Sequence, residues 1–247
     1  MRLPEKGNFS GEAHVFWAGK RYKNARREAS RSIMFRTPCN IIVGGPSGSG
    51  KSYFTKGCLD AARELFVPPP PVKHYCYGAW QPLFETMNDV SFHEGLPTVE
   101  DLDKWFGPTK GGLLVVDDLM EESGNSKNIL DLFTKYSHHR GITLMYLCQD
   151  LFPPGKHAKT MSRNAHYMVV FKNPRDQVGI RTLMIQAFPT YWREALQTFE
   201  QATSRPFGYL MIDLHPASND NHRLFSHLLD RQGYTRLYEK EDDRERS

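Results

Sequence analysis

The stretch that most constrains the fold is residues 44–54, which read GGPSGSGKSYF. Residues 45–52 match the pattern G-x-x-x-x-G-K-[ST] in full. They follow the apolar run 39–44 and precede an amphipathic stretch from about 51 to 66, so the pattern lies between a strand and a helix as its mechanism requires. We therefore predict a phosphate-binding loop, in preference to a chance glycine-rich turn.

The residue types in this loop suit a ligand with several phosphates. Glycines let backbone N–H groups wrap the phosphates without Cβ clashes, and the N-terminus of the following helix adds partial positive charge. Lys51 is expected to reach the β- and γ-phosphates, and Ser52 to hold Mg²⁺. The predicted nucleotide-binding residues are Gly45, Pro46, Ser47, Gly48, Ser49, Gly50, Lys51, Ser52 and Tyr53.

A tandem pair of acids ends the apolar run LLVVDD at 113–118. An acid at the end of a neighbouring buried strand is needed to hold the metal or its waters, and we assign this role to Asp117. Asp118 is proposed as the base or water-positioning residue, although it could instead cap the following turn. Glu121 and Glu122 are alternates for that role.

The next apolar run, 142–150, ends in Gln149 and Asp150. Ligands of parallel sheets collect at the carboxyl ends of the strands, so we predict that Gln149 contacts the γ-phosphate or the attacking water. The alternative is that it caps a loop. No arginine-rich lid insertion is evident, and the tandem acid suits water as the acceptor, so hydrolysis is favoured over the phosphoryl transfer of a nucleotide kinase.

Short apolar runs alternate with longer amphipathic stretches along most of the chain. Expected strands are 39–45, 74–78, 90–95, 113–118, 142–150, 166–172 and 208–214. Expected helices are 51–66, 98–106, 126–139, 157–164, 175–187 and 191–202. This pattern predicts an α/β fold whose parallel sheet is covered by helices on both faces. The expected organisation is a basic N-terminal extension (1–35), a nucleotide-binding domain (36–216), and a C-terminal helix with a charged tail (217–247).

The formal charge of +4 is too mild to prove a polyanionic partner, but its distribution is uneven. Residues 20–36 hold seven cations against one acid, Glu28; the cations are Lys20, Arg21, Lys23, Arg26, Arg27, Arg31 and Arg36. Such an arm suits sequence-independent contact with DNA phosphates, with Trp17 and Tyr22 available for stacking. A solvated basic helix or a nuclear-import signal would look the same.

The cysteines and the hydropathy indicate the compartment. Cys39, Cys58, Cys76 and Cys148 form no C-x-x-C pair, so we expect reduced core thiols. No apolar run approaches the roughly 20 residues that a membrane span needs. We expect a soluble intracellular protein without a membrane partner.

Several segments resemble the FtsK/HerA-like packaging ATPases. They are HYCYGAWQPLF (74–84), VSFHEGLP (90–97), LLVVDDLM (113–120), LFTKYSHHRGITLMYLCQDLF (132–152), SRNAHYMVVFKNPRDQ (162–177) and FGYLMIDLHP (207–216). The likeness covers roughly residues 36–216 and is greatest to the versions in Polinton-related viruses such as adintoviruses and adomaviruses, with the poxvirus packaging ATPase more distant. Two departures are Lys159, where relatives often carry arginine, and Asp118, where FtsK and HerA carry glutamate.

The resemblance implies a P-loop NTPase of the additional-strand, RecA/FtsK-like type, with ATP and Mg²⁺ as cofactors. It implies a homo-oligomeric ring that translocates double-stranded DNA into a preformed capsid, with a capsid or portal protein as a further partner. It also implies a Gln at the position of Gln149. The expected location is the host nucleus or a viral assembly site, with association to the virion. Rival functions are a helicase or replication ATPase, a nucleotide-dependent assembly switch and a nucleotide kinase.

Ring motors commonly complete each site with an arginine from the next subunit. The candidates are Arg140, Arg163 and Arg175. Arg140 lies at a helix end, where the macrodipole alone favours a cation. Arg163 is preferred because it directly precedes the strand 166–172, which we expect at a sheet edge. His138 and His139 lack companions at metal-ligand spacing, so we expect a helix-terminal or solvent-facing pair.

Overall fold

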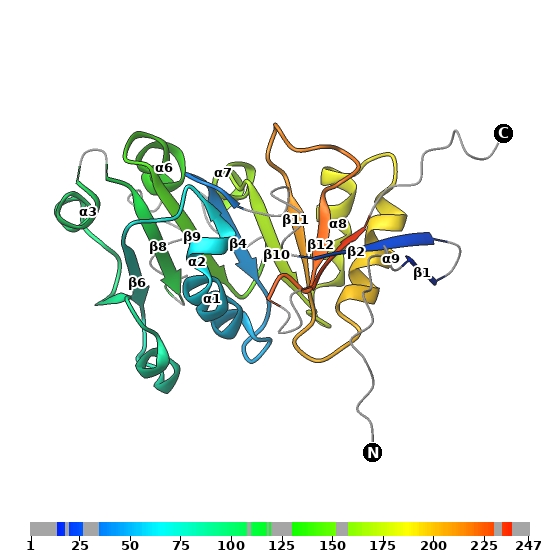
Figure 1. Cartoon of the computed structure of the whole chain (residues 1–247), viewed down its shortest axis with the longest axis horizontal. Coiled ribbons are helices and arrows are strands. Elements are labelled where there is room, and N and C mark those ends of the chain that lie inside the picture. The colour runs from blue at the N-terminus through cyan, green and yellow to red at the C-terminus, as the bar shows by residue number, and fades with distance from the viewer. Residues whose placement is uncertain are drawn as a thin grey trace, which may run out of the picture.

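A computed structural model describes residues 14–17, 20–26, 35–107, 110–117, 119, 130–151, 158–229 and 234–238. They form one eleven-stranded mixed sheet with helices on both faces (Figure 1). The strand order is β1-β2-β13-β12-β11-β10-β4-β9-β8-β6-β7. A separate two-stranded ribbon pairs β3 (Phe35–Arg36) with β5 (Phe66–Val67).

Six neighbouring strands at one end of the sheet run parallel. They are β10 (Tyr167–Phe171), β4 (Asn40–Gly44), β9 (Ile142–Cys148), β8 (Gly112–Asp117), β6 (Lys73–Tyr77) and β7 (Ser91–Glu94). Every residue of β4, β8, β9 and β10 is buried, which explains why these runs are apolar throughout instead of alternating. The carboxyl ends of all six strands therefore meet at one edge of the sheet.

One strand is inserted between the two strands that were expected to carry the phosphate loop and the metal-binding acid. Leu147 of β9 pairs on one side with Val43 of β4 and on the other with Asp117 of β8. This is the additional-strand order predicted from the sequence. The chain has an α/β P-loop NTPase fold, with a mainly parallel sheet at its centre and helices on both faces.

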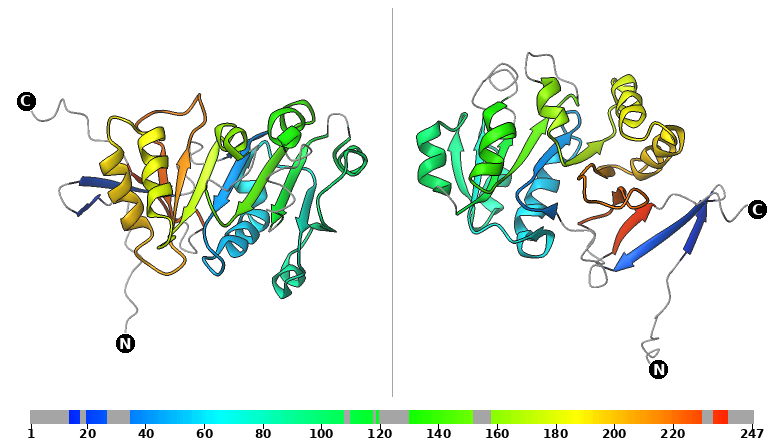
Figure 2. Two further views of the ribbon diagram at one scale, coloured as in Figure 1. Left: turned by 180° about the vertical axis from the view of Figure 1, so that it is seen from behind. Right: turned by 90° about the horizontal axis from the view of Figure 1, so that it is seen from above.

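The helices form two layers, one on each face of the sheet (Figure 2). One layer holds α1 (Lys51–Asp60), α2 (Ala62–Leu65) and the 3-10 helix η3 (Pro82–Thr86). The other holds α3 (Val99–Phe106), the π-helix η4 (Leu132–Tyr136), α6 (Ser137–His139), α7 (Ala158–Arg163), α8 (Gln177–Ala187) and α9 (Trp192–Ala202).

Strand residues alternate between the two hydrophobic cores that these layers create. In β9, Leu144 and Tyr146 belong to the core under α3 and α8, whereas Met145 and Leu147 belong to the core under α1. This alternation buries both faces of the sheet, as the apolar runs predict. Among the helices of the described residues, none is long and apolar enough to cross a bilayer.

The other end of the sheet is antiparallel, so the sheet as a whole is mixed and its parallel part is the half that carries the phosphate loop. β11 (Tyr209–Asp213) runs antiparallel to β10, with Val169 opposite Met211. The sheet continues antiparallel through β12 (Leu224–Ser226), β13 (Tyr234–Tyr238), β2 (Lys20–Arg26) and β1 (His14–Trp17). The strand expected at an edge, β10, is therefore an interior strand between β4 and β11.

Two expectations for the ends of the chain are corrected by this extension. Within the described residues of 217–247 there is no helix; β12 and β13 occupy that segment. In β13, Thr235, Leu237 and Tyr238 are buried and Arg236 is half-buried, so this strand is part of the core. Residues 20–26, expected in an extension outside the core, form β2 and pair with β13.

Candidate functional site

The predicted phosphate loop connects β4 to α1 at the carboxyl edge of the parallel strands. Gly48 and Gly50 have φ of +75° and +106°, a region that residues with a Cβ rarely adopt. Gly50 is the N-cap of α1 and makes no side-chain capping bond, and the first turn of α1 carries no acid. The amide groups at this helix end therefore face the loop without a competing side-chain anion, as an anion site needs.

Lys51 lies across the loop and contacts its backbone. Its Nζ donates hydrogen bonds to the carbonyl oxygens of Gly45 (2.5 Å) and Pro46 (3.0 Å). Both acceptors are neutral carbonyls, which bind an ammonium less strongly than phosphate oxygens do. The lysine is held over the loop at the position from which it would exchange these carbonyls for a phosphate.

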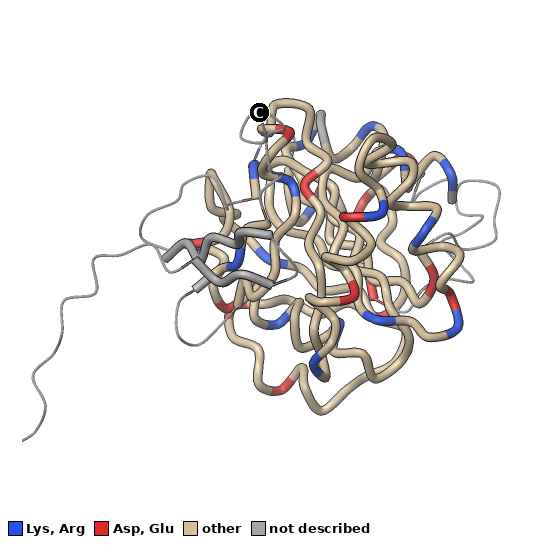
Figure 3. Tube along the Cα trace, turned by 90° about the vertical axis from the view of Figure 1, so that its right-hand side faces the viewer, with Lys and Arg blue, Asp and Glu red and all other residues tan. Residues whose placement is uncertain are grey.

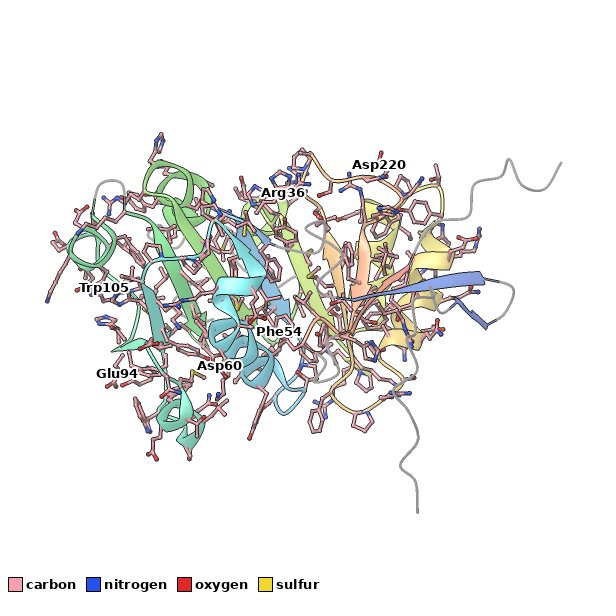
Figure 4. All side chains as sticks on the ribbon, viewed as in Figure 1. Arg36, Phe54, Asp60, Glu94, Trp105 and Asp220 are labelled. Atoms are coloured by element: carbon pink, nitrogen blue, oxygen red, sulfur yellow. The ribbon has the colours of Figure 1, made fainter. Side chains whose placement is uncertain are left out.

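The base of the loop is closely packed against the sheet. A Cβ added to Gly45 would lie 2.7 Å from Cβ of Phe171 and 2.9 Å from Oγ of Ser49. Phe54 on α1, labelled in Figure 4, packs edge-on against Phe171 and Tyr209 with centroid distances of 6.3 and 4.8 Å. These contacts fix the start of α1 relative to β10 and β11, and thus fix the direction in which the loop amides point.

Asp117 is the last residue of β8, as predicted, and only 4% of it is exposed. The Tyr75 hydroxyl donates a 2.6 Å hydrogen bond to its Oδ2. Burial and the neighbouring Asp117 carboxylate raise the pKa of Tyr75, while a hydrogen bond with the Ser52 side chain opposes the rise. Tyr75 therefore stays protonated and holds the carboxylate predicted to bind Mg²⁺.

One cavity of about 570 Å³ brings most of the predicted site residues together. Its lining comprises Ser47, Gly48, Gly50, Lys51, Ser52, Tyr53, Gln81, Pro82, Leu83, Asp117, Leu147, Cys148, Gln149 and Phe207. The loop, the acid and the polar strand end come from β4, β8 and β9, which are adjacent in the sheet. The sequence-based grouping of these residues is thus a grouping in space.

The oxygen atoms in this cavity suit a magnesium ion. Ser52 offers a hydroxyl and Asp117 a carboxylate, both hard oxygen ligands of the kind that Mg²⁺ prefers. Mg²⁺ at phosphate sites takes only one or two protein ligands and completes its octahedron with water and phosphate oxygens. A larger cluster is not required, and groups of three or more His, Cys, Asp or Glu side chains are absent from the part of the chain described here.

Of the remaining predicted catalytic residues, the structure describes some and not others. Gln149 directly follows β9 and borders the cavity, so it stands at the strand end where it was expected. Asp118 and its alternates Glu121 and Glu122 lie outside the described residues.

The three candidate arginines lie in different surroundings. Arg140 is engaged locally: its Nη2 is 2.9 Å from Oδ1 of Asp103, and its guanidinium lies 4.6 Å from the ring centroid of Tyr136. Arg163 is exposed at the end of α7. Arg175 is exposed between β10 and α8, at the same sheet edge as the phosphate loop.

The position of Arg163 excludes a role in the site of its own chain. The carbonyl of its neighbour Asn164 accepts a 2.9 Å hydrogen bond from Asn40 Nδ2, at the amino end of β4. The phosphate loop follows the opposite, carboxyl end of that strand. A role for Arg163 at a nucleotide site would therefore require a second copy of the chain.

Tyr75 and Phe207 are among the residues at the site that were not predicted from the sequence. Tyr75 lies in the apolar run 74–78, and the available signal was a phenol hydroxyl in a strand that would bury it, since buried tyrosine hydroxyls find partners. Phe207 belongs to the loop between α9 and β11 and borders the same cavity. No spacing rule connects residue 207 to residues 45–52.

No protein-family model matches the chain, and the comparison with curated proteins gives no match. Similar solved structures include the genome packaging NTPase B204 from Sulfolobus turreted icosahedral virus 2 in complex with ATP-gammaS, with 15% identity, a TM-score of 0.44, and coverage of 72% of this chain and 93% of that chain. B204, the DNA-packaging ATPase from Sulfolobus turreted icosahedral virus, shares 13% identity, with a TM-score of 0.46 and coverage of 84% of this chain and 100% of that chain. The flagellar accessory protein FlaH from Methanocaldococcus jannaschii shares 12% identity, with a TM-score of 0.39 and coverage of 64% of this chain and 80% of that chain. Likenesses this distant leave the function to be inferred from the chain's own residues.

Proposed function

We propose that this chain is an ATP-hydrolysing motor that translocates double-stranded DNA into a viral capsid. The observation that carries hydrolysis is the single cavity of about 570 Å³ bordered by Lys51, Ser52, Asp117 and Gln149. These four side chains supply a phosphate-binding cation, two metal ligands and a polar group for the attacking water. The packaging role rests on the resemblance of residues 36–216 to packaging ATPases.

Each group of site residues has its own role in the transfer of the γ-phosphoryl group to water. Loop amides bind the phosphates, and Lys51 exchanges the carbonyls of Gly45 and Pro46 for phosphate oxygens. Gln149, at the end of β9, orients the attacking water, and Asp118 accepts its proton. Mg²⁺ held by Ser52 and Asp117 would neutralise charge on the phosphate oxygens.

The proposal also includes the assembly of several copies of this chain. Identical subunits form a ring in which Arg163 of one subunit reaches the nucleotide of the next and stabilises the charge of the transition state. In GTPases, an arginine in this role is worth about 10³–10⁵ in rate. DNA and a capsid or portal protein are the proposed partners. The proposed place of action is the host nucleus or a viral assembly site.

ATP turnover by the purified protein, with and without blunt duplex DNA, tests this proposal. We expect strong stimulation by the duplex. It should vanish in Lys51→Ala and persist in Lys56→Ala, a matched change on the same helix whose Nζ pairs with Asp60 instead of lining the cavity. A turnover rate that does not change when DNA is added would contradict the motor function. Absence of turnover would favour a nucleotide-dependent assembly switch.

Two further outcomes separate the remaining rivals. Unwinding of a forked duplex with no response to a blunt one would indicate a helicase. A phosphorylated small-molecule product would indicate a nucleotide kinase, because a motor releases only inorganic phosphate.

A further inference from the structure

The loop that enters β11 holds an aromatic residue in an unfavourable backbone conformation. The amide of Gly208 donates a 3.0 Å hydrogen bond to the carbonyl of Arg205, which closes a four-residue turn with Pro206 second and Phe207 third. Phe207 has φ of +60°. Proline in second place and positive φ in third are the signature of a type II turn, whose third residue is normally glycine or asparagine. A phenylalanine there is held at a conformational cost.

The ring of Phe207 is not used to fill the core. The residue is 71% exposed, so hydrophobic burial does not compensate for the strained backbone. A bulky residue kept in the left-handed region, with its side chain in solvent, is the kind of outlier that marks a functional position.

The ring lies against the phosphate loop. Its Cδ1 and Cβ lie 3.3 and 3.4 Å from the point where a Cβ on Gly50 would stand. Phe207 borders both the 570 Å³ cavity over the loop and a second cavity of about 390 Å³. Gly48 also borders both cavities. The second cavity therefore begins where the phosphate site ends, with Phe207 at the junction.

We propose that Phe207 is the platform on which the base of the bound nucleotide stacks, and that the 390 Å³ cavity is the nucleoside subsite. This rests on the proposed function, because it assigns the remaining part of the same nucleotide. The triphosphate occupies the loop, and the sugar and base extend past Gly48 onto the exposed face of the ring. Stacking of a base on an aromatic side chain is worth about 1–3 kcal/mol in nucleic-acid complexes, or about 5- to 150-fold in affinity.

The stacking itself does not select a base. Every base presents a π-face, so an aromatic platform tolerates different bases. The hydroxyl of Thr203 donates to the carbonyl of Phe199, and that of Ser204 donates to the carbonyl of Gln201, at 2.8 Å each. These two hydroxyl protons are committed to the backbone, so they are not available to the edge of a base.

Calorimetric binding of ATP and of inorganic tripolyphosphate, each with Mg²⁺, isolates the base. Tripolyphosphate uses the loop but has nothing to place on Phe207. We expect Phe207→Leu to bind ATP about 10-fold more weakly and Phe207→Trp to bind it at least as tightly as the wild type, with tripolyphosphate unchanged in both. Equal losses for both ligands, or no loss for ATP, would overturn the stacking role.

Phe207→Gly gives a second test that does not depend on the size of the side chain. Glycine is the residue that the turn prefers, so the melting temperature should be no lower than that of the wild type while ATP binding weakens. A lower melting temperature would show that Phe207 serves stability. If the wild-type protein binds neither ATP nor tripolyphosphate, the proposed function itself fails; if all variants bind ATP equally, only the stacking inference does.

Discussion

The hydroxyl of Tyr75 donates a 2.6 Å hydrogen bond to Oδ2 of Asp117, and both residues are buried. In the strand register Tyr75 is opposite Val115, two residues before Asp117, so the phenol reaches diagonally across the β6–β8 pair. The Ser52 side chain also acts on this hydroxyl, since it lowers the pKa of Tyr75. Tyr75 thereby orients the Asp117 carboxylate before any ion binds.

Tyr75→Phe should weaken the magnesium site while leaving the phosphate loop intact. The variant removes a donor from a buried carboxylate, so we expect a loss of about 1–3 kcal/mol in unfolding free energy without ligand. The Mg²⁺ concentration for half-maximal turnover should rise several-fold, because the Asp117 carboxylate is less well oriented. A Mg²⁺ titration of ATP turnover measures this shift.

Tyr77→Phe is the matched control for that change. Tyr77 lies on the same strand but is half-buried and does not line the cavity. The Mg²⁺ concentration that gives half-maximal turnover should therefore be the same in Tyr77→Phe as in the wild type. If Tyr75→Phe lowered maximal turnover with no change in the magnesium midpoint, the hydroxyl would not act through the metal ligands.

Buried thiols should make the protein lose stability in alkaline solution. Burial raises the pKa of both Cys76 and Cys148 to about 12, from an ordinary value of 9.0. Above pH 9 the unfolded chain releases these protons while the native protein keeps them, so the unfolding free energy falls as pH rises towards 12. We expect about 1 kcal/mol per thiol between pH 8 and 10, measured by urea denaturation.

Replacement of one thiol isolates its share of this pH dependence. Cys76→Ala should be less stable at pH 8 because of the space left behind, yet it should lose less stability than the wild type on going to pH 10. Comparing the pH-induced change cancels the packing loss. An identical change in both proteins would mean that Cys76 does not contribute.

Arg140 and Arg163 should respond in opposite ways to replacement by alanine. Arg140→Ala can no longer pair with Asp103 or pack on Tyr136, so its unfolding free energy should fall by about 1 kcal/mol while turnover in assembled protein is kept. Arg163→Ala, at an exposed position, should keep the wild-type melting temperature, ATP binding and assembly, but lose most turnover. Calorimetry and a phosphate-release assay measure the two effects.

A mixing experiment tests whether Arg163 acts on a neighbouring subunit. Arg163→Ala and Lys51→Ala should each be nearly inactive alone. Rings assembled from both contain some sites with an intact loop beside an intact arginine, so the mixture should regain part of the turnover. A mixture as inactive as its components would remove Arg163 from the proposed site and leave Arg175 as the candidate.

The cations of β2 should govern the salt dependence of DNA binding. Over most of the described chain Lys and Arg are interspersed with Asp and Glu (Figure 3). Changing the four cations of β2 to Gln should lower the slope of log affinity against log salt by about 0.9 for each DNA phosphate that the strand no longer neutralises. These residues are Lys20, Arg21, Lys23 and Arg26.

Substitution is preferable here to deletion of residues 1–35, because β2 pairs with five residues of β13 and deletion would remove that pairing. Neutralising the same number of exposed cations elsewhere controls for net charge. A suitable set is Arg63, Lys104, Lys110 and Lys135. A slope that changes equally in both sets would place the DNA contact outside β2.

The parallel half of the fold could be predicted because its signals are local. The runs that became β4, β8, β9 and β10 are apolar throughout, and the loop pattern requires a helix directly after β4. The direction of β11 could not be predicted, since an apolar run reads the same in a parallel and in an antiparallel strand. In residues 217–247 the short apolar pair Leu237 and Tyr238 lies beside a highly charged tail, so it gave no clear strand signal.

Site residues that lie at the ends of strands could be predicted from the sequence. Contacts that depend on how neighbouring strands are aligned could not. Asp117 and Gln149 end buried strands, so their meeting at one edge is a consequence of strand direction alone. The partner of Tyr75 depends on how β6 is aligned with β8, which the sequence does not specify. The sequence R-P-F-G at 205–208 would suggest glycine as the special residue of the turn, whereas Phe207 adopts the positive φ.

The pairing of β2 with β13 sets the order of events on the ribosome. Lys23 is opposite Leu237, so β2 must wait for a strand that is made much later. At about 5–20 residues per second, the intervening chain takes roughly 10–40 s to synthesise. Throughout that interval one edge of β2 has no strand to pair with, and cationic residues are what natural proteins place on such edges to prevent pairing with other chains. The four cations of β2 would therefore disfavour such pairing until β13 is made, a role separate from any contact with DNA.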